Sequence, residues 1–413
     1  MHLKTLSLTA IAVAVGATQP VFASQQSDAT GFTEGAHFTV KTRNMYMNRD
    51  QRAEGAAQSY GEEWAQGFVG VLESGFTQGT VGFGIDLLGQ FAQKLDTGDG
   101  RTGGGTGLLE QGSSGAKDNQ SELGGVLKMQ ISNTVLKYGT QITSVPVLGT
   151  SDSRLLPETV EGFSVNSKEF KDLTLAAGHF TGLSNRNQSS RDSGRMTSVD
   201  YVGGTYKITP QWGASLYYGD TDNYFRKYYV NTNYVLPLSD NQSLKFDFNG
   251  YDTKSTGQER SGELDNRIWS ISAGYSVGAH TFVLAHQQVN GTGDYVYGPD
   301  GNASYVFANS VQYSDFNYED EKSWQARYDI NLATYGVPGL SFMTRYVKGT
   351  DFNTAATDNG KAWERDIEGR YVVQSGKAKD LSLRIRHASY RSSDRGGQID
   401  EVRVITDYPF NVF

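Results

Sequence analysis

Two arginines that lie two positions apart have the clearest chemical meaning in this chain. Arg384 and Arg386 occur in the segment DLSLRIRHASYR, where Leu383 and Ile385 alternate with them. On a helix such residues point about 200° apart, whereas on a β-strand they share one face at a spacing of about 7 Å. A guanidinium can hold a carboxylate through two parallel hydrogen bonds. If the aliphatic face meets lipid, the arginine face lines an aqueous interior. A carboxylate can then move from one arginine to the next.

A second segment of this kind lies near the end of the chain. In EVRVITDYPFNVF, Glu401 and Arg403 alternate with Val402 and Val404. Two roles for these arginines remain open at this point. They can bind a passing anion, or they can pair with acidic side chains and only brace an interior.

The chain begins with a segment that we exclude from the fold. A charged start precedes an apolar run from Leu6 to Val15, and Val21-Phe22-Ala23 ends the segment with a small residue. This order is typical of a secretory signal peptide. We expect residues 1–23 to be removed and residues 24–413 to form a single domain.

The composition narrows the class of protein. The 413 residues include 49 Gly, 24 Tyr, 20 Phe and no Cys, and the formal net charge is −8. Many aromatic residues and glycines favour strands and turns, and stability without disulfides then depends on strand pairing. No basic patch indicates a nucleic-acid partner. The six histidines lack metal-ligand spacing and no Gly-x-Ser-x-Gly motif occurs, so we expect no metal, no cofactor and no enzymatic activity.

Alternation with a period of two recurs along the chain. In TVGFGIDLLG, Phe83, Ile85 and Leu87 oppose Gly84 and Asp86, and SWQARYDINL, KYYVNTNYVL and RIWSISAGY follow the same pattern. The spacing of three and four residues that a helix needs fits none of these segments. The sequence therefore predicts an all-β fold built from many strands with one apolar and one polar face.

Short and long connections alternate between these strands. We expect tight turns at 209–211, 238–242, 276–280, 336–339 and 375–380, and longer polar loops at 219–225, 251–265, 290–308, 348–362 and 392–400. This rhythm is typical of a transmembrane antiparallel barrel with periplasmic turns and external loops. The final Phe413 is similar to the C-terminal signal that the barrel-assembly machinery of bacterial outer membranes reads.

Several blocks resemble one family in the same order along the chain. GFTEGAHFTVKTRNMYMNRD, EWAQGFVGVLESGFTQGTVGFGIDLLGQFAQKLD, LKYGTQITSVPVLGTSDSRLLPETVEGF, NSVQYSDFN, YGVPGLSFMTRYVKG and DYPF are similar to the OprD-type (Occ) substrate-specific porins of pseudomonads. The resemblance runs from residue 31 to the end of the chain. It implies an 18-stranded antiparallel transmembrane β-barrel that functions as a monomer, with a long loop folded into the lumen.

The resemblance also implies which residues line the pore. The basic ladder of the family matches Arg384, Arg386, Arg403, Arg43 and Arg49, the opposing electronegative pocket matches Ser310 and Asp315, and a pore-lining tyrosine matches Tyr295. The inserted loop matches SDSRLLPET, which carries Asp152, Arg154 and Glu158. Two features depart from the family: Gln130 replaces a ladder arginine, and the loop after Phe180 is shorter, which leaves the substrate open.

These observations predict a channel in the outer membrane of a Gram-negative bacterium. We expect its partners to be outer-membrane lipid and small carboxylate or amino-acid solutes that diffuse passively down their gradients. The alternatives are a general diffusion porin with weak selectivity, which Gln130 favours, and an aromatic-carboxylate-specific channel. An alternative outside the transport class also remains open, namely a secreted β-rich hydrolase or a surface-binding protein.

Overall fold

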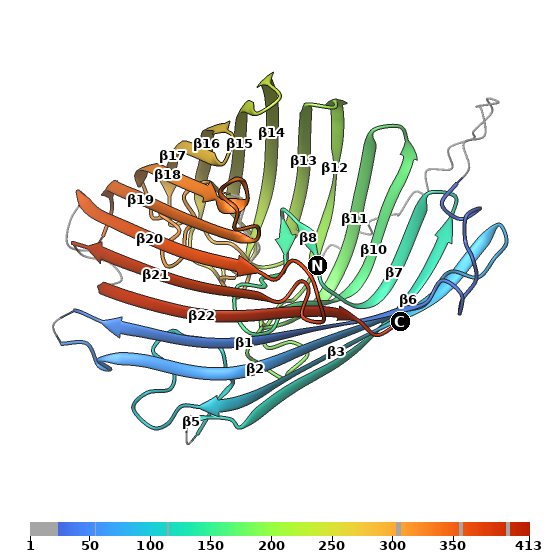
Figure 1. The fold of residues 1–413 in the computed structure, drawn as a ribbon, viewed down its shortest axis with the longest axis horizontal. Helices are drawn as coiled ribbons and strands as arrows, with labels where there is room; N and C mark the ends of the chain where they lie inside the picture. Colours follow the sequence, from blue (N-terminus) through green and yellow to red (C-terminus); the bar gives the residue numbers. More distant parts are fainter. Residues whose placement is uncertain (1–23, 54, 114, 303–306, 355–357, 394–396) are drawn as a thin grey trace, which may run out of the picture.

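Each strand of this chain pairs with the next one, and the last strand pairs with the first. The computed structural model describes residues 24–53, 55–113, 115–302, 307–354, 358–393 and 397–413, so the expected signal peptide, residues 1–23, lies outside the described residues. Eighteen strands form one antiparallel sheet, which closes because β1 pairs with both β2 and β22 (Figure 1). The predicted 18-stranded antiparallel barrel is therefore confirmed. Among the described residues, no helix is long and apolar enough to cross a bilayer.

The barrel strands follow the order of the sequence. They are β1 (His37–Gln51), β2 (Tyr60–Glu73), β3 (Val81–Asp96), β6 (Asn119–Ile131), β7 (Thr134–Gln141), β10 (Thr159–Phe170), β11 (Leu173–Ser184), β12 (Val199–Thr209), β13 (Trp212–Thr221), β14 (Phe225–Ser239), β15 (Gln242–Ser255), β16 (Asp265–Val277), β17 (His280–Thr292), β18 (Lys322–Asn331), β19 (Leu340–Phe352), β20 (Gly360–Val372), β21 (Ser382–Ser392) and β22 (Gln398–Asn411). Two small hairpins, β4 (Gln111–Gly112) with β5 (Gly115–Ala116) and β8 (Ser144–Val145) with β9 (Leu148–Gly149), and a 3₁₀ turn, η1 (Leu332–Tyr335), lie in the connections.

The two faces of the strands differ as the alternation predicts. On β21, the outward Leu383 and Ile385 are 44% and 52% exposed, whereas the side chains of Arg384 and Arg386 are 29% and 16% exposed. On β18, Trp324 is exposed and Ser323 is buried. Apolar side chains on the outer face of a closed barrel contact hydrocarbon, so polar residues fill its interior.

The connections differ in length at the two ends of the barrel. Short turns lie at 132–133, 171–172, 210–211, 240–241 and 278–279, and longer segments at 97–118, 142–158, 185–198 and 293–321. Several strands extend further into the expected loops than the sequence predicted. The expected loop 219–225 was wrong, because β13 continues to Thr221, β14 begins at Phe225, and residues 222–224 alone connect them. Polar residues face the lumen as well as loops, so polarity does not mark where a strand ends.

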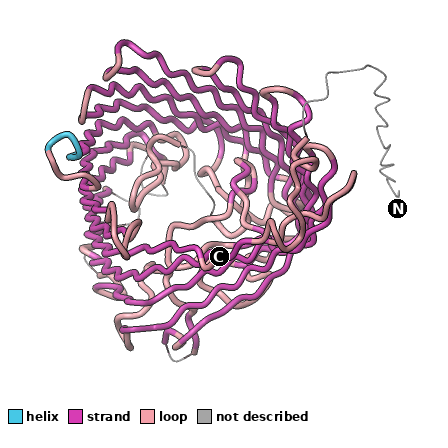
Figure 2. Tube along the Cα trace, turned by 45° about the vertical axis from the view of Figure 1, so that its right-hand side comes forward, coloured by secondary structure: helices cyan, strands magenta, loops and turns pink. Residues whose placement is uncertain are grey.

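The connection 142–158 crosses the interior of the barrel. At one end, the hydroxyl of Tyr251 on β15 donates a hydrogen bond to the carbonyl of Pro146 at 2.8 Å. Further along, Asp152 accepts one from Arg43 on β1 at 2.8 Å. Because β1 and β15 lie far apart around the sheet, the segment between these contacts spans the lumen. Figure 2 shows loop segments inside the ring of strands.

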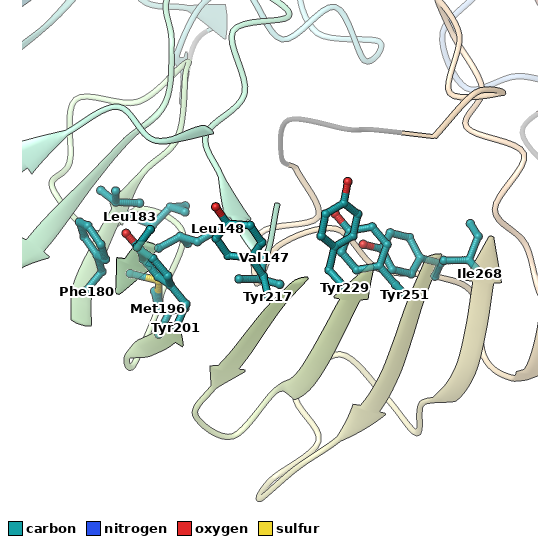
Figure 3. Packing of buried hydrophobic residues seen from close by; sticks show 14 of the residues in the cluster. Val147, Leu148, Phe180, Leu183, Met196, Tyr201, Tyr217, Tyr229, Tyr251 and Ile268 are labelled. Atoms are coloured by element: carbon teal, nitrogen blue, oxygen red, sulfur yellow. The ribbon is translucent and has the colours of Figure 1, made fainter. Parts of the chain in front are cut away.

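An aromatic cluster holds this crossing segment against one wall. Val147 and Leu148 pack in the same buried cluster as Tyr201, Tyr217 and Tyr251, whose side chains point inward from β12, β13 and β15 (Figure 3). These rings are buried although they belong to lumenal positions of the barrel. The apolar contact removes the loop from water and fixes its path.

Candidate solute site in the channel

A polar cavity of about 270 Å³ lies where the crossing segment meets the wall formed by β1, β21 and β22. Six arginines and two aspartates line it: Arg43, Arg154, Arg186, Arg384, Arg386, Arg403, Asp152 and Asp315. Of the predicted site residues, Arg43, Arg384, Arg386, Arg403, Asp152, Arg154 and Asp315 therefore meet in one place. Arg49, Ser310, Tyr295 and Glu158 do not line this cavity.

Arg384 and Arg386 on β21 retain unused hydrogen-bond donors. Nη2 of Arg384 lies 3.8 Å from Oδ2 of Asp407, and Nε of Arg386 lies 2.9 Å from Oε2 of Glu368. Neither Nε atom makes a hydrogen bond with any described residue, although both are buried. Arg386 and Glu368 are therefore close enough to form an ion pair, but their relative orientation does not allow a hydrogen bond from Nε. The two side chains are partly exposed and line the cavity, so their guanidinium groups favour a ligand that brings acceptor oxygens.

Arg43 on β1 joins the wall to the crossing segment. Its Nε donates to Asp407 at 2.8 Å, and its Nη1 donates to Asp152 at 2.8 Å and to the carbonyl of Arg154. Burial on its own would raise the pKa of Asp152, but Arg43 and Lys41 hold the pKa below its usual value. Arg43 therefore keeps the loop carboxylate ionised and in place.

Arg403 and Arg49 share one buried carboxylate. Glu401 on β22 accepts from Nε of Arg403 at 2.6 Å and from Nη2 of Arg49 at 2.7 Å. Nη2 of Arg403 also donates to the carbonyl of Gln312 at 2.7 Å, and the Arg49 guanidinium lies 4.9 Å from the centre of the Tyr313 ring. Arg49 thus braces the wall behind the cavity, whereas Arg403 still borders it.

The crossing segment and the loop after β11 add two more cations. Arg154 donates to the carbonyl of Thr106 at 2.8 Å, and Arg186 donates to the hydroxyls of Ser151 and Ser153, both at 3.0 Å. Burial and then the charge of neighbouring arginines lower the pKa of Arg154 well below its usual value. Because an arginine in a protein keeps its proton, this direction indicates a place that disfavours more positive charge and favours an anion.

Asp315 supplies negative charge to the same cavity. Burial raises its pKa to about 6, against hydrogen bonds from Tyr297 and Ser310 and the charge of Arg154, which lower it. The Tyr297 hydroxyl lies 2.7 Å from that of Ser310. Ser310 is therefore placed to support Asp315 from outside the cavity, and Tyr297 borders the cavity directly.

Two predicted residues lie deeper in the protein. Tyr295 is 4% exposed and packs against Tyr251 and Phe307 at centroid distances of 5.3 and 5.2 Å. Glu158 is buried at the far end of the crossing segment and accepts a hydrogen bond from the Ser151 N–H at 2.7 Å. Burial and the charge of Asp300 raise the pKa of Glu158 to about 8. Both residues are positioned to hold loops.

The basic track continues beyond the predicted residues. A second cavity of about 300 Å³, next to the short turn at 278–279, is lined by Arg327, Arg345, Arg370 and again Arg386. The sequence contained a signal for them, since Arg327 lies on the polar face of SWQARYDINL. Arg186 and Tyr297 were missed because they lie in loops, where alternation carries no information. Among the described residues, no group of His, Asp and Glu has the arrangement of a metal site.

A closed antiparallel barrel with an apolar outer face and a charge-lined lumen defines a transmembrane channel of the porin class. The comparisons with known proteins agree with this class. The sequence model of "outer membrane porin, OprD family" matches residues 30–412, and the chain belongs to this family. It is accordingly a non-enzymatic, multi-pass channel of the Gram-negative outer membrane.

Relatives and solved structures share both the sequence and the fold. Porin D of Pseudomonas aeruginosa is 44% identical, and the alignment covers 100% of both chains. Acinetobacter baumannii OccAB1 superimposes with a TM-score of 0.89 at 34% identity, over 94% of this chain and 100% of that one. Pseudomonas aeruginosa OpdK, crystallised with vanillate, gives a TM-score of 0.83 at 33% identity, over 92% and 100% of the two chains. The predicted family is confirmed.

Proposed function

We propose that this porin selects small nutrients by their carboxylate group and lets them diffuse passively through the cavity. The candidates are amino acids, small peptides and organic acids. The observation that carries the proposal is that the guanidinium groups of Arg384 and Arg386 line the cavity and make ion pairs, but no hydrogen bond, with the described residues around them. A carboxylate can bind the two guanidinium groups in succession, because the two side chains lie on the same face of one strand.

Asp315 makes the selection depend on the other end of the solute. A carboxylate that approaches the arginine wall meets the negative charge of Asp315 and Asp152 in the same cavity. A plain anion gains nothing from these groups, whereas an ammonium or hydroxyl group on the solute can bind to them. Selection then depends on the difference in affinity between a plain anion and a solute that also carries an ammonium or hydroxyl group, and not only on attraction to positive charge.

An aromatic carboxylate is the second candidate. The rings of Tyr297 and Tyr313 border the cavity beside the arginines, and the relative OpdK was crystallised with vanillate. An aromatic ring in contact with these tyrosines would gain contact area that an aliphatic amino acid lacks. A general diffusion porin is the remaining alternative, and Gln130 on the lumenal face of β6 is the feature that supports it.

Single-channel recordings of the double variant Arg384→Gln/Arg386→Gln test the proposal. We expect glutamate or benzoate to block the wild-type current at least ten times more tightly than it blocks the variant, because two charge-assisted contacts are lost. Arg267→Gln is the matched control, since this arginine lies on the outer face and is paired with Asp252 at 2.8 Å. Equal blockade in all three proteins would refute the arginine track. If benzoate blocks the wild-type current far more tightly than glutamate does, the aromatic candidate is favoured.

A further inference from the structure

We propose that the outer face of β18, β19 and β20 binds the phosphate-bearing headgroup of an anionic lipid in the outer leaflet. This face lies on the exterior of the barrel, so its binding does not depend on the solute in the lumen. The site combines basic and aromatic side chains on the outer face of three adjacent strands, which we call the β18–β20 patch: Lys322, Trp324, Tyr346, Lys348, Trp363 and Arg365. All of them are exposed except Trp363, which is half-buried.

Strand register makes this patch compact. Lys348 on β19 is paired with Trp324 on β18 and with Trp363 on β20. One pair further along, Tyr346 is paired with Arg365. Side chains in adjacent strands lie about 5 Å apart and those two positions along a strand about 7 Å apart. Both cations are therefore within reach of one phosphate or of two phosphates on one headgroup.

The charges of the patch differ from those on the outer face of β15 and β16. On β15 and β16, Lys254 is paired with Asp265 at 2.9 Å, and Arg267 is paired with Asp252. Lys322, at the edge of the patch, is paired with Asp351 at 3.2 Å. In contrast, Lys348 and Arg365 make no side-chain hydrogen bond or ion pair with any residue that the structure describes, and both are exposed.

The position of the patch fits the level of lipid headgroups. Lys322 and Gly360 begin their strands at the end of the barrel with the longer connections, which is the external end of such barrels. Charged side chains in hydrocarbon are strongly disfavoured, so Lys348 and Arg365 extend to the interface. Trp324 is 63% exposed and Tyr346 is 45% exposed, as expected for aromatic residues between lipid and water.

These features favour a lipid over a free anion. Arginine binds phosphate through two parallel hydrogen bonds, and lysine adds a compact charge. The exposed ring of Tyr346 and the half-buried ring of Trp363, next to the two cations, offer apolar contact that an acyl chain can use and inorganic phosphate cannot. An acidic protein partner would not need the aromatic rings at membrane level. The chemistry therefore points to an amphiphile with a phosphorylated headgroup.

Native mass spectrometry of the detergent-solubilised full chain tests this proposal. The probes are lipid A, which carries two phosphates, phosphatidylcholine, and inorganic phosphate. We expect the wild type to retain lipid A, and the variant Lys348→Gln/Arg365→Gln to bind it about thirty-fold more weakly, from two lost charges at a membrane surface. Neither phosphatidylcholine nor inorganic phosphate should give a comparable adduct.

A control variant removes the same amount of charge at the opposite end of the barrel. Lys171→Gln/Lys379→Gln changes two exposed lysines in the short connections and should bind lipid A like the wild type. Far-ultraviolet circular dichroism and single-channel current establish that every variant is folded. Equal lipid A binding by the patch variant, equal retention of phosphatidylcholine, or a dimer that forms without lipid through this face would each overturn the proposal.

Discussion

Lys227 anchors the external loop at the cavity to the wall of the barrel. It lies on β14, is 2% exposed, and donates from Nζ to the carbonyl of Val296 at 2.5 Å and to that of Tyr297. Its ammonium also lies 4.3 Å from the ring centre of Phe225 and 4.6 Å from that of Tyr295. No carboxylate among the described residues makes an ion pair with it.

Substitution of Lys227 by Met keeps most of the aliphatic stem and removes these contacts. A hydrogen bond to a charged group contributes roughly 1.5–3 kcal/mol, and a desolvated cation–π contact about 2 kcal/mol. The cost of burying an unpaired ammonium, several kcal/mol, offsets much of this sum. We therefore expect the free energy of local opening of the loop anchored at Val296 and Tyr297 to fall by about 2 kcal/mol. The equilibrium constant for opening should then rise roughly thirty-fold.

Hydrogen exchange and single-channel recording measure the two consequences of this change. The amides of 293–302 should exchange about thirty-fold faster, while those of β14 remain protected. Because Tyr297 borders the cavity, the open-channel current should also fluctuate more. Lys254→Met is the matched control, since Lys254 is half-exposed and paired with Asp265 on the outer face. Unchanged exchange at 293–302 would refute the idea that Lys227 positions this loop.

Two further predictions concern acidic groups near the cavity. Because the pKa of Asp315 is about 6, this residue is mostly ionised at pH 7 and mostly protonated at pH 5, so acidification should weaken the binding of cationic groups and raise anion permeability. Reversal potentials in a salt gradient measure this shift, and Asp315→Asn should abolish its dependence on pH. The second change, Glu401→Gln, leaves Arg49 and Arg403 without their shared carboxylate and should destabilise the barrel by about 3–5 kcal/mol. Urea unfolding followed by gel migration measures this loss, and unchanged stability would contradict a bracing role for the pair.

The sequence predicted the barrel and the direction of its side chains well, for a physical reason. Alternation with a period of two is imposed by the strand itself, so Leu383 and Arg384 could be assigned to opposite faces without any partner. Strand ends were predicted less well, because polar lumenal residues resemble loop residues. The family resemblance identified the crossing segment, which no periodicity in SDSRLLPET indicates.

The roles of individual arginines depend on contacts that the sequence does not display. Arg43 and Arg49 lie on the same face of β1, yet one borders the cavity and the other is held behind it by Glu401. The partner comes from β22, at the other end of the chain, and the register of β1 with β22 decides which carboxylate each arginine meets. Tyr295 and Tyr297 differ in the same way, since Tyr297 borders the cavity and Tyr295 is buried behind it. A loop has no period that fixes which of two rings faces the cavity.

Lumenal arginines of this barrel therefore fall into two groups according to their hydrogen bonds. Arg49 and Arg403 bind Glu401 tightly, and a solute that displaced this carboxylate would leave it buried without a partner. Arg384 and Arg386 have donors in reserve, so a solute carboxylate adds hydrogen bonds without breaking any. Passive conduction needs sites that gain from the solute and still release it. The guanidinium donors of β21 that make no hydrogen bond, and not the number of arginines, are the feature that makes this wall suitable for a moving carboxylate.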